Sequence, residues 1–147
     1  MVCLGNICRS PIAEGVMQHK ILEAGLDWTV ASAGTESYHV GSQPHIHSIE
    51  ICEANGIDIR HQRARRFTAD DFDEYDKIYA MAADVYNEIL RIAGDKARPE
   101  KLELFLNELN PGKNESVPDP WYGNKHGYYG VYQMINATCG KIIERYR

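Results

Sequence analysis

Segments with strand-like and helix-like apolar spacing alternate along this chain. Expected strands are residues 28–33, 77–81 and 101–106; expected helices start at Ser10 as N-cap with Pro11, at Ile46, at Asp84 as cap and near Tyr128. This alternation is typical of a parallel sheet covered by helices on both faces. In such sheets ligands bind beyond the carboxyl ends of the strands. The loop before Ser10 is expected at that end.

Composition limits the class of protein. The 147 residues are 44% hydrophobic and 25% charged, with a formal net charge of -5. These values predict one globular domain over residues 1–147 and argue against disorder. No apolar run reaches the roughly 18 residues of a membrane span, and no secretory signal is visible, so we expect a cytoplasmic protein. The acidic balance argues against nucleic acid as a partner.

The first ten residues carry the strongest chemical signal. Cys3 is followed six positions later by Arg9, and Gly5 and Asn6 between them allow unusual backbone dihedrals. Successive N–H groups of such a loop can turn inward and form a cradle for an anion. The N-terminus of the following helix adds a positive end, and Arg9 adds a fork of donors that suits phosphate.

The same positive field favours the thiolate of Cys3, which is a competent nucleophile toward phosphorus. Ser10 is placed to hydrogen-bond that sulfur before attack and when it leaves. The alternative is a buried strand cysteine with a surface arginine. The motif favours the catalytic interpretation over that alternative, because it combines Gly5, Asn6, Ser10 and Pro11.

Cleavage of a phosphoester also needs a proton donor for the departing oxygen, and Asp119 is the best candidate. Prolines on both sides restrict its backbone. Trp121 and Tyr122 follow with flat apolar surfaces that suit an aryl leaving group.

The segments Val2–Pro11 and Asp119–Gly123 resemble the low-molecular-weight protein tyrosine phosphatases, and the resemblance covers nearly the whole chain. It implies a three-layer α/β fold with a four-stranded parallel sheet flanked by helices, of the flavodoxin-like or phosphotyrosine phosphatase I-like type. It implies hydrolysis of phosphotyrosine through a phosphocysteine on Cys3, with Asp119 as general acid and then base. The implied phosphate-binding loop is Leu4, Gly5, Asn6, Ile7, Cys8, Arg9 and Ser10; the implied pocket walls are Ile7, Tyr38, Trp121 and Tyr122. No metal or cofactor is implied.

The chain departs from the family pattern at three places. Only Met1 and Val2 precede the nucleophile, where the family has several apolar strand residues, so the first strand is expected to be truncated. We predict upstream residues of hydrophobic strand character in the native gene. Gln62 stands where the family often has histidine, and Ala82 follows Met81 where Met-Asp is common.

Three other functions are compatible with a phosphate-binding loop. Arsenate reductases of this fold use two further cysteines close together in sequence, whereas Cys52 and Cys139 lie far apart. Arginine phosphatases typically carry threonine at the position of Ile7, and the bulkier isoleucine favours an aryl phosphate. A phosphate-binding module without turnover would need neither a thiolate nor the acid Asp119.

Other expectations concern single residues and partners. Cys8 is either a buried filler or a resolving thiol that forms a reversible disulfide with Cys3. His45 and His47 are expected on different sides of a helix and are predicted to be structural, not metal ligands. The expected partners are tyrosine-phosphorylated proteins, such as a tyrosine kinase encoded nearby, and the expected state is a monomer or weak dimer.

Overall fold

The computed structural model describes residues 1–147, the side chain of Tyr122 excepted. The strands are β1 (Val2–Cys3), β2 (Ala33–Gly34), β3 (Ile78–Ala80) and β4 (Leu102–Leu104). The α-helices are α1 (Arg9–Glu23), α2 (Ile46–Ala54), α3 (Asp71–Glu74), α4 (Ala83–Ala93) and α5 (His126–Tyr146). Short 3-10 helices span Gly94–Lys96, Pro99–Lys101, Phe105–Glu108 and Pro120–Tyr122.

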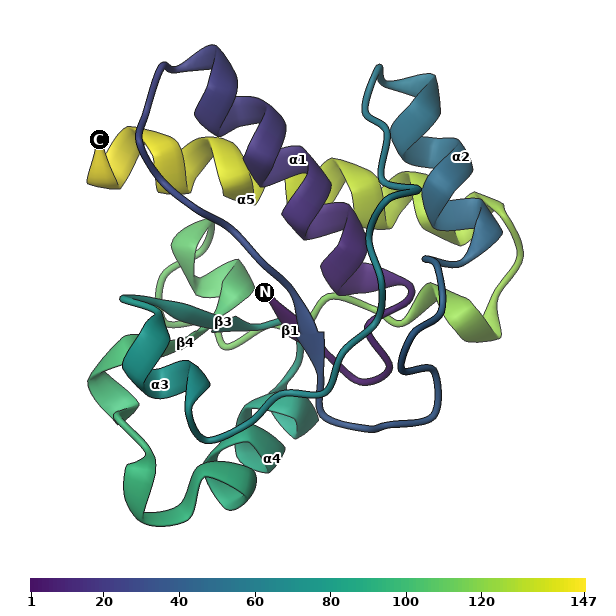
Figure 1. The fold of residues 1–147 in the computed structure, drawn as a ribbon. Coiled ribbons are helices and arrows are strands. Elements are labelled where there is room, and N and C mark those ends of the chain that lie inside the picture. The colour runs from purple at the N-terminus through teal and green to yellow at the C-terminus, as the bar shows by residue number, and fades with distance from the viewer.

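The four strands form one parallel sheet in the order β2-β1-β3-β4 (Figure 1). Val2 pairs with Ala33 on one side and with Ala80 on the other, so β1 lies inside the sheet. The predicted fold class is therefore confirmed. The upstream strand residues predicted from the sequence stay a prediction.

Alternation along β1 divides the core into two layers. Cys3 belongs to a large apolar cluster that includes side chains of α1, α2 and α5, whereas Val2 belongs to a second cluster formed with α4 and β4. Figure 1 shows α1, α2 and α5 on one face of the sheet and α3 and α4 on the other. Because successive side chains of a strand point to opposite faces, two residues are enough to join both layers.

Several predicted boundaries were wrong. Residues 28–32 have no regular secondary structure, so β2 is only two residues long. Residues 105–108 form a 3-10 helix instead of continuing β4. α1 begins at Arg9, which makes Cys8 its N-cap and puts Ser10 and Pro11 inside the helix. Asp84 lies in the first turn of α4 instead of capping it; Ser116 Oγ accepts from the amide of Ala83, 2.9 Å away.

Among the helices that the structure describes, none is long and apolar enough to cross a membrane.

Candidate active site

Cys3 is the last residue of β1 and Arg9 is the first residue of α1, so the loop between them lies at the carboxyl end of the sheet. This is where the sequence placed the candidate site. Cys3, Cys8, Arg9 and Ser10 are all at most 5% exposed. A 15-residue helix thus begins where the loop ends, and its free N–H groups and positive end face an anion bound there.

The loop's carbonyl groups are tied to the surrounding chain. Cys3 O accepts from Thr35 N at 3.0 Å, Leu4 O from Glu36 N at 2.9 Å, Ile7 O from His45 N at 2.8 Å, and Cys8 O from Ser48 Oγ at 3.1 Å. The C=O and N–H of a trans peptide point in opposite directions, and the described chain holds no cis bond. Each anchored carbonyl therefore turns the next residue's N–H toward the inside of the loop. Such a ring of amides is a cradle for an oxyanion.

Asn6 holds the loop in this shape. Its φ of 57° lies in the left-handed region, which asparagine tolerates better than most side chains. Its side-chain Oδ1 accepts from the amide of Arg65 at 3.0 Å, and its Nδ2 donates to Ser10 Oγ at 2.7 Å and to Ser32 Oγ at 3.0 Å. One buried amide thus connects α1, the segment before β2 and the segment before α3.

Ser10 lies between Asn6 and the candidate nucleophile. Its Oγ is 3.0 Å from Cys3 Sγ and already accepts a proton from Asn6. The single hydroxyl proton of Ser10 can therefore point at a Cys3 thiolate, which is closer than the other acceptor in reach, Ala33 O at 3.5 Å. At the other end of the chain of hydrogen bonds, Ser32 accepts from Asn6 and donates to Glu14 Oε1 at 2.7 Å.

Gly34 allows the loop to pass close to β2. A Cβ on this residue would lie 2.8 Å from Leu4 O and 3.0 Å from Asn6 N. Both neighbours are backbone atoms of the loop, and Leu4 O is held in place by the amide of Glu36 at 2.9 Å. A larger residue at this position would therefore displace the cradle itself.

Arg9 and Asp119 meet although they are far apart in sequence. Arg9 Nη1 donates to Val117 O at 3.0 Å, and Nη2 lies 3.5 Å from Asp119 Oδ2. The side chain of Arg9 is 6% exposed and that of Asp119 is 24% exposed, so the carboxylate reaches solvent while the guanidinium is buried. Asp119 also caps the following 3-10 helix by accepting from Trp121 N at 3.0 Å.

The rim of the site is more imidazole-rich than the sequence suggested. Trp121 lies between His39 and His45, with ring centroids 5.9 Å and 5.2 Å away. His39 also lies against the loop, since its Cδ2 is 3.0 Å from a Cβ placed on Gly5. Tyr38, the expected wall, is 74% exposed and touches the edge of His39. Tyr122, another expected wall, has its side chain outside the described residues.

His45 does not lie inside a helix as expected. It is the N-cap of α2, and its Nδ1 accepts from His47 N at 3.1 Å. The two imidazole rings are 5.1 Å apart instead of pointing to different sides, because a cap residue has non-helical dihedrals. Burial and the neighbouring His47 lower the pKa of His45. The described residues bring no three His, Cys, Asp or Glu side chains together as a metal site.

Cys8 is buried within the loop, and its Sγ lies 3.4 Å from the hydroxyl of Tyr128 on α5. Burial raises the pKa of the Cys8 thiol to about 12. The hydroxyl of Tyr128 also lies 3.3 Å from Nδ1 of His45. Cys52 and Cys139 are fully buried in the core, and burial raises the pKa of each to about 12.

The family described as "Low molecular weight phosphotyrosine protein phosphatase" matches residues 1–147. The chain belongs to this family. The low molecular weight phosphotyrosine protein phosphatase of Schizosaccharomyces pombe is 39% identical over 141 residues, which cover 93% of this chain and 89% of that protein. The family resemblance predicted from the two motifs, and the class of cysteine-based phosphatases that it implies, are confirmed.

Solved members of this low-molecular-weight phosphatase family share the fold. Vibrio vulnificus Wzb, solved with benzylphosphonate, superimposes with a TM-score of 0.87 at 27% identity and covers 98% of this chain and 94% of its own. A Drosophila arginine phosphatase superimposes with a TM-score of 0.90 at 28% identity, over 99% of this chain and 95% of its own. Overall shape therefore does not separate an aryl phosphate from a phosphoarginine, and local residues must decide.

Proposed function

We propose that the protein hydrolyses phosphotyrosine on proteins through a phosphocysteine intermediate on Cys3. The observation that carries the proposal is the position of Cys3 Sγ, 3.0 Å from Ser10 Oγ, at the start of a loop in which the carbonyls of Cys3, Leu4, Ile7 and Cys8 are bonded to the surrounding chain. Amides, a helix N-terminus and Arg9 then offer their donors to a phosphate from one side.

The first step is attack of the Cys3 thiolate on phosphorus. The P–S bond forms as the bond from phosphorus to the phenolic oxygen breaks, and protonated Asp119 gives its proton to that oxygen. In the second step Asp119 removes a proton from water as the water oxygen attacks phosphorus. The P–S bond breaks, Ser10 donates to the sulfur that receives the electron pair, and inorganic phosphate leaves.

Arg9 is placed to bind the substrate. In the structure its guanidinium donates to Val117 O, lies 3.5 Å from Asp119 Oδ2 and is buried. A phosphate dianion is a stronger partner for the fork of donors than one carboxylate oxygen at 3.5 Å. Substrate binding would therefore release Asp119 for proton transfer.

Ile7 and Trp121 support an aryl leaving group. Ile7 is 8% exposed within the loop, and Trp121 is 48% exposed on the rim. A flat ring can stack on the indole, whereas the side chain of a phosphoserine is too short to reach it. Tyr38 completes the proposed wall, and the part of Tyr122, whose side chain lies outside the described residues, stays a prediction from the sequence.

Two variants test the mechanism. Cys3→Ser should abolish turnover while inorganic phosphate still binds, as measured by calorimetry. Asp119→Ala should lower kcat for phosphotyrosine about 100- to 10,000-fold and lower it far less for p-nitrophenyl phosphate, whose leaving group needs no proton. Equal losses on both esters would refute Asp119 as the acid.

A substrate panel separates the alternatives at the same site. Phosphotyrosine, phosphoserine, phosphoarginine and arsenate are compared by kcat/KM. We expect phosphotyrosine to be preferred. A preference for phosphoarginine would assign the chain to the activity named for its Drosophila relative.

We also propose that Cys8 is a resolving thiol. Peroxide would oxidise Cys3 to a sulfenic acid, and Cys8 would then displace water from it to form a disulfide. Burial keeps Cys8 protonated, with a pKa near 12, so it does not compete with Cys3 as nucleophile. Mild peroxide followed by mass mapping should show a Cys3–Cys8 link, whereas Cys3 found only as sulfinic acid would leave Cys8 as a buried filler.

The proposed partners are tyrosine-phosphorylated proteins, with a tyrosine kinase encoded nearby as one candidate, and the proposed state is a monomer or weak dimer. The four cysteines are free in the structure, and the proposed chemistry needs a reduced thiol. This supports a cytoplasmic site of action.

A further inference from the structure

Three side chains connect the inside of the loop between β1 and α1 to the rim of the site. Cys8 Sγ lies 3.4 Å from the hydroxyl of Tyr128, and that hydroxyl lies 3.3 Å from Nδ1 of His45. Cys8 and Tyr128 are at most 5% exposed, whereas His45 is only half-buried. The hydrogen bonds therefore lead from a buried thiol to a side chain that reaches solvent. The hydrolysis proposed above uses neither Tyr128 nor His45.

The amide of His47 fixes the direction of these bonds. It donates to His45 Nδ1 at 3.1 Å, so this nitrogen carries no proton and acts as an acceptor. The hydroxyl of Tyr128 must then donate to His45 Nδ1, and its oxygen is left to accept the proton of the Cys8 thiol. Every proton along the three side chains thus points from the loop toward the rim.

The surroundings of His45 favour its neutral form. The titratable and charged groups around it lie on α2 and α5 and at the start of α5: His47, Glu50, Tyr128 and Lys125. Burial and His47 lower the pKa of His45, and Glu50 opposes this only weakly because its carboxylate is paired with Lys125 at 2.7 Å. Trp121 adds an uncharged ring. Near pH 7 the imidazole is therefore able to accept a proton.

The resolving step proposed for Cys8 needs such an acceptor. Burial raises the pKa of the Cys8 thiol to about 12. At pH 7 only about one molecule in 100,000 then carries the thiolate that attacks a sulfenic sulfur. Burial and the neighbouring Cys8 also raise the pKa of Tyr128, so its hydroxyl can pass a proton on but does not remain ionised. His45 is the first group along the path that can hold the proton.

We propose that Tyr128 and His45 carry the proton of Cys8 out of the loop while Cys8 forms a disulfide with oxidised Cys3. The proposal rests on the proposed role of Cys8 as the resolving thiol. Hydrogen peroxide first converts the Cys3 thiolate to a sulfenic acid and is itself reduced to water.

The disulfide step moves one proton along the three side chains. The sulfur of Cys8 attacks the sulfur of Cys3, so that the S–S bond forms as the S–O bond of the sulfenic acid breaks. The proton of Cys8 moves to the oxygen of Tyr128 while the proton of Tyr128 moves to His45 Nδ1. The departing hydroxide receives a proton from His45 through solvent. The products are the disulfide and one water molecule, and both relay side chains regain their initial protonation.

The fate of oxidised Cys3 tests this relay. Its sulfenic acid either forms the disulfide, at a rate independent of peroxide, or reacts with a second peroxide molecule to give a sulfinic acid. Mass mapping over a series of peroxide concentrations gives the half-point, the concentration at which half of Cys3 becomes sulfinic acid. The half-point rises with the rate of the disulfide step. Tyr128→Phe removes only the hydroxyl and should lower the half-point at least about tenfold.

Two further variants complete the comparison. Tyr132→Phe is the matched control, because Tyr132 is also buried and lies one turn further along α5 without a hydrogen bond to Cys8. It should leave the half-point unchanged. His45→Asn keeps a side-chain acceptor for the amide of His47 but removes the base, so it should act like Tyr128→Phe. All three variants should retain the kcat of the unchanged protein for p-nitrophenyl phosphate.

A pH profile separates a relay from a structural role. The protonated imidazole of His45 cannot accept a proton from Tyr128. The ratio of the half-points of the unchanged protein and Tyr128→Phe should therefore fall toward one as the pH is lowered through the pKa of His45. Effects of pH on peroxide and on Cys3 are common to both proteins and cancel in this ratio.

Equal half-points in Tyr128→Phe and Tyr132→Phe, or a ratio that does not change with pH, would overturn the relay and leave the resolving role of Cys8 intact. Sulfinic acid without any disulfide at every peroxide concentration in the unchanged protein would refute both. Neither outcome bears on hydrolysis of phosphotyrosine, because kcat is measured separately on the reduced protein.

Discussion

At the scale of single residues, Ser10 connects the candidate nucleophile to the network that shapes the loop. It accepts from Asn6 at 2.7 Å and faces Cys3 Sγ at 3.0 Å. Asn6 in turn is fixed by Ser32 and by the amide of Arg65. The order of these bonds leaves Ser10 with one proton, and a thiolate is the strongest acceptor near it.

Ser10→Ala should therefore destabilise the thiolate form of Cys3. It also removes the Ser10 hydroxyl that accepts from the side-chain amide of Asn6. A hydrogen bond to a charged group is worth about 1.5–3 kcal/mol, which corresponds to a loss in kcat of about 10- to 100-fold. Alkylation of Cys3 by iodoacetamide at pH 6 should slow in parallel. Ser32→Ala, one bond further from the sulfur, is the matched control and should slow alkylation less. Equal effects of the two variants would mean that Ser10 acts only through the fold.

At the scale of elements, the sequence predicts the parts of the fold that depend on local chemistry. Gly5, Asn6 and Pro11 indicate a loop followed by a helix, and the family motif locates Cys3 and Arg9. The length of β2 was missed, because strand propensity at Trp28–Ser32 describes an extended chain but not the presence of a neighbour to pair with. His39 and His45 were missed at the rim because only tertiary packing brings them to Trp121.

Two glycines on different elements should respond with opposite signs to the same substitution. Gly34→Ala in β2 forces a Cβ to within 2.8 Å of Leu4 O and should cost about 1–3 kcal/mol of unfolding free energy together with most of the activity. Gly130→Ala in α5 meets no heavy atom within 4 Å and should stabilise by about 0.5–1 kcal/mol. Urea unfolding and phosphatase assays check both. A stable, active Gly34→Ala would show that the loop does not need this close approach.

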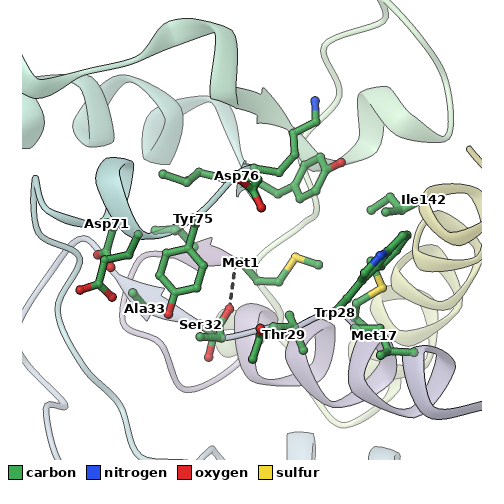
Figure 2. A pocket seen from close by; sticks show the side chains of 18 of the residues that line it. Met1, Met17, Trp28, Thr29, Ser32, Ala33, Asp71, Tyr75, Asp76 and Ile142 are labelled. Carbon is green, nitrogen blue, oxygen red and sulfur yellow. Dashed lines mark hydrogen bonds between the residues drawn. The ribbon is translucent and has the colours of Figure 1, made fainter. Parts of the chain in front are cut away.

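At the scale of the whole molecule, the two ends of β1 differ in the charge that their surroundings favour. The carboxyl end gathers amides and Arg9 around a site for an anion. At the amino end, the α-amino group of Met1 donates to Ala31 O at 3.0 Å (Figure 2), and burial lowers its pKa from 8.0 to about 6. The ammonium form is therefore disfavoured in the folded protein and not in the unfolded chain.

The folded protein should consequently become more stable as pH rises from 6 to 8. Over this range the unfolded chain binds the extra proton, so raising the pH removes a penalty on folding that amounts to about 2 kcal/mol in unfolding free energy. Burial also lowers the pKa of His45, which adds a contribution of the same sign. Acetylation of the α-amino group separates the contribution of the amine from that of His45, because it removes the charge but keeps an N–H that can donate to Ala31 O. Urea midpoints measured at pH 6, 7 and 8 should rise steeply for the free amine and weakly for the acetylated protein, and parallel curves would show that the amine titrates normally in the folded state.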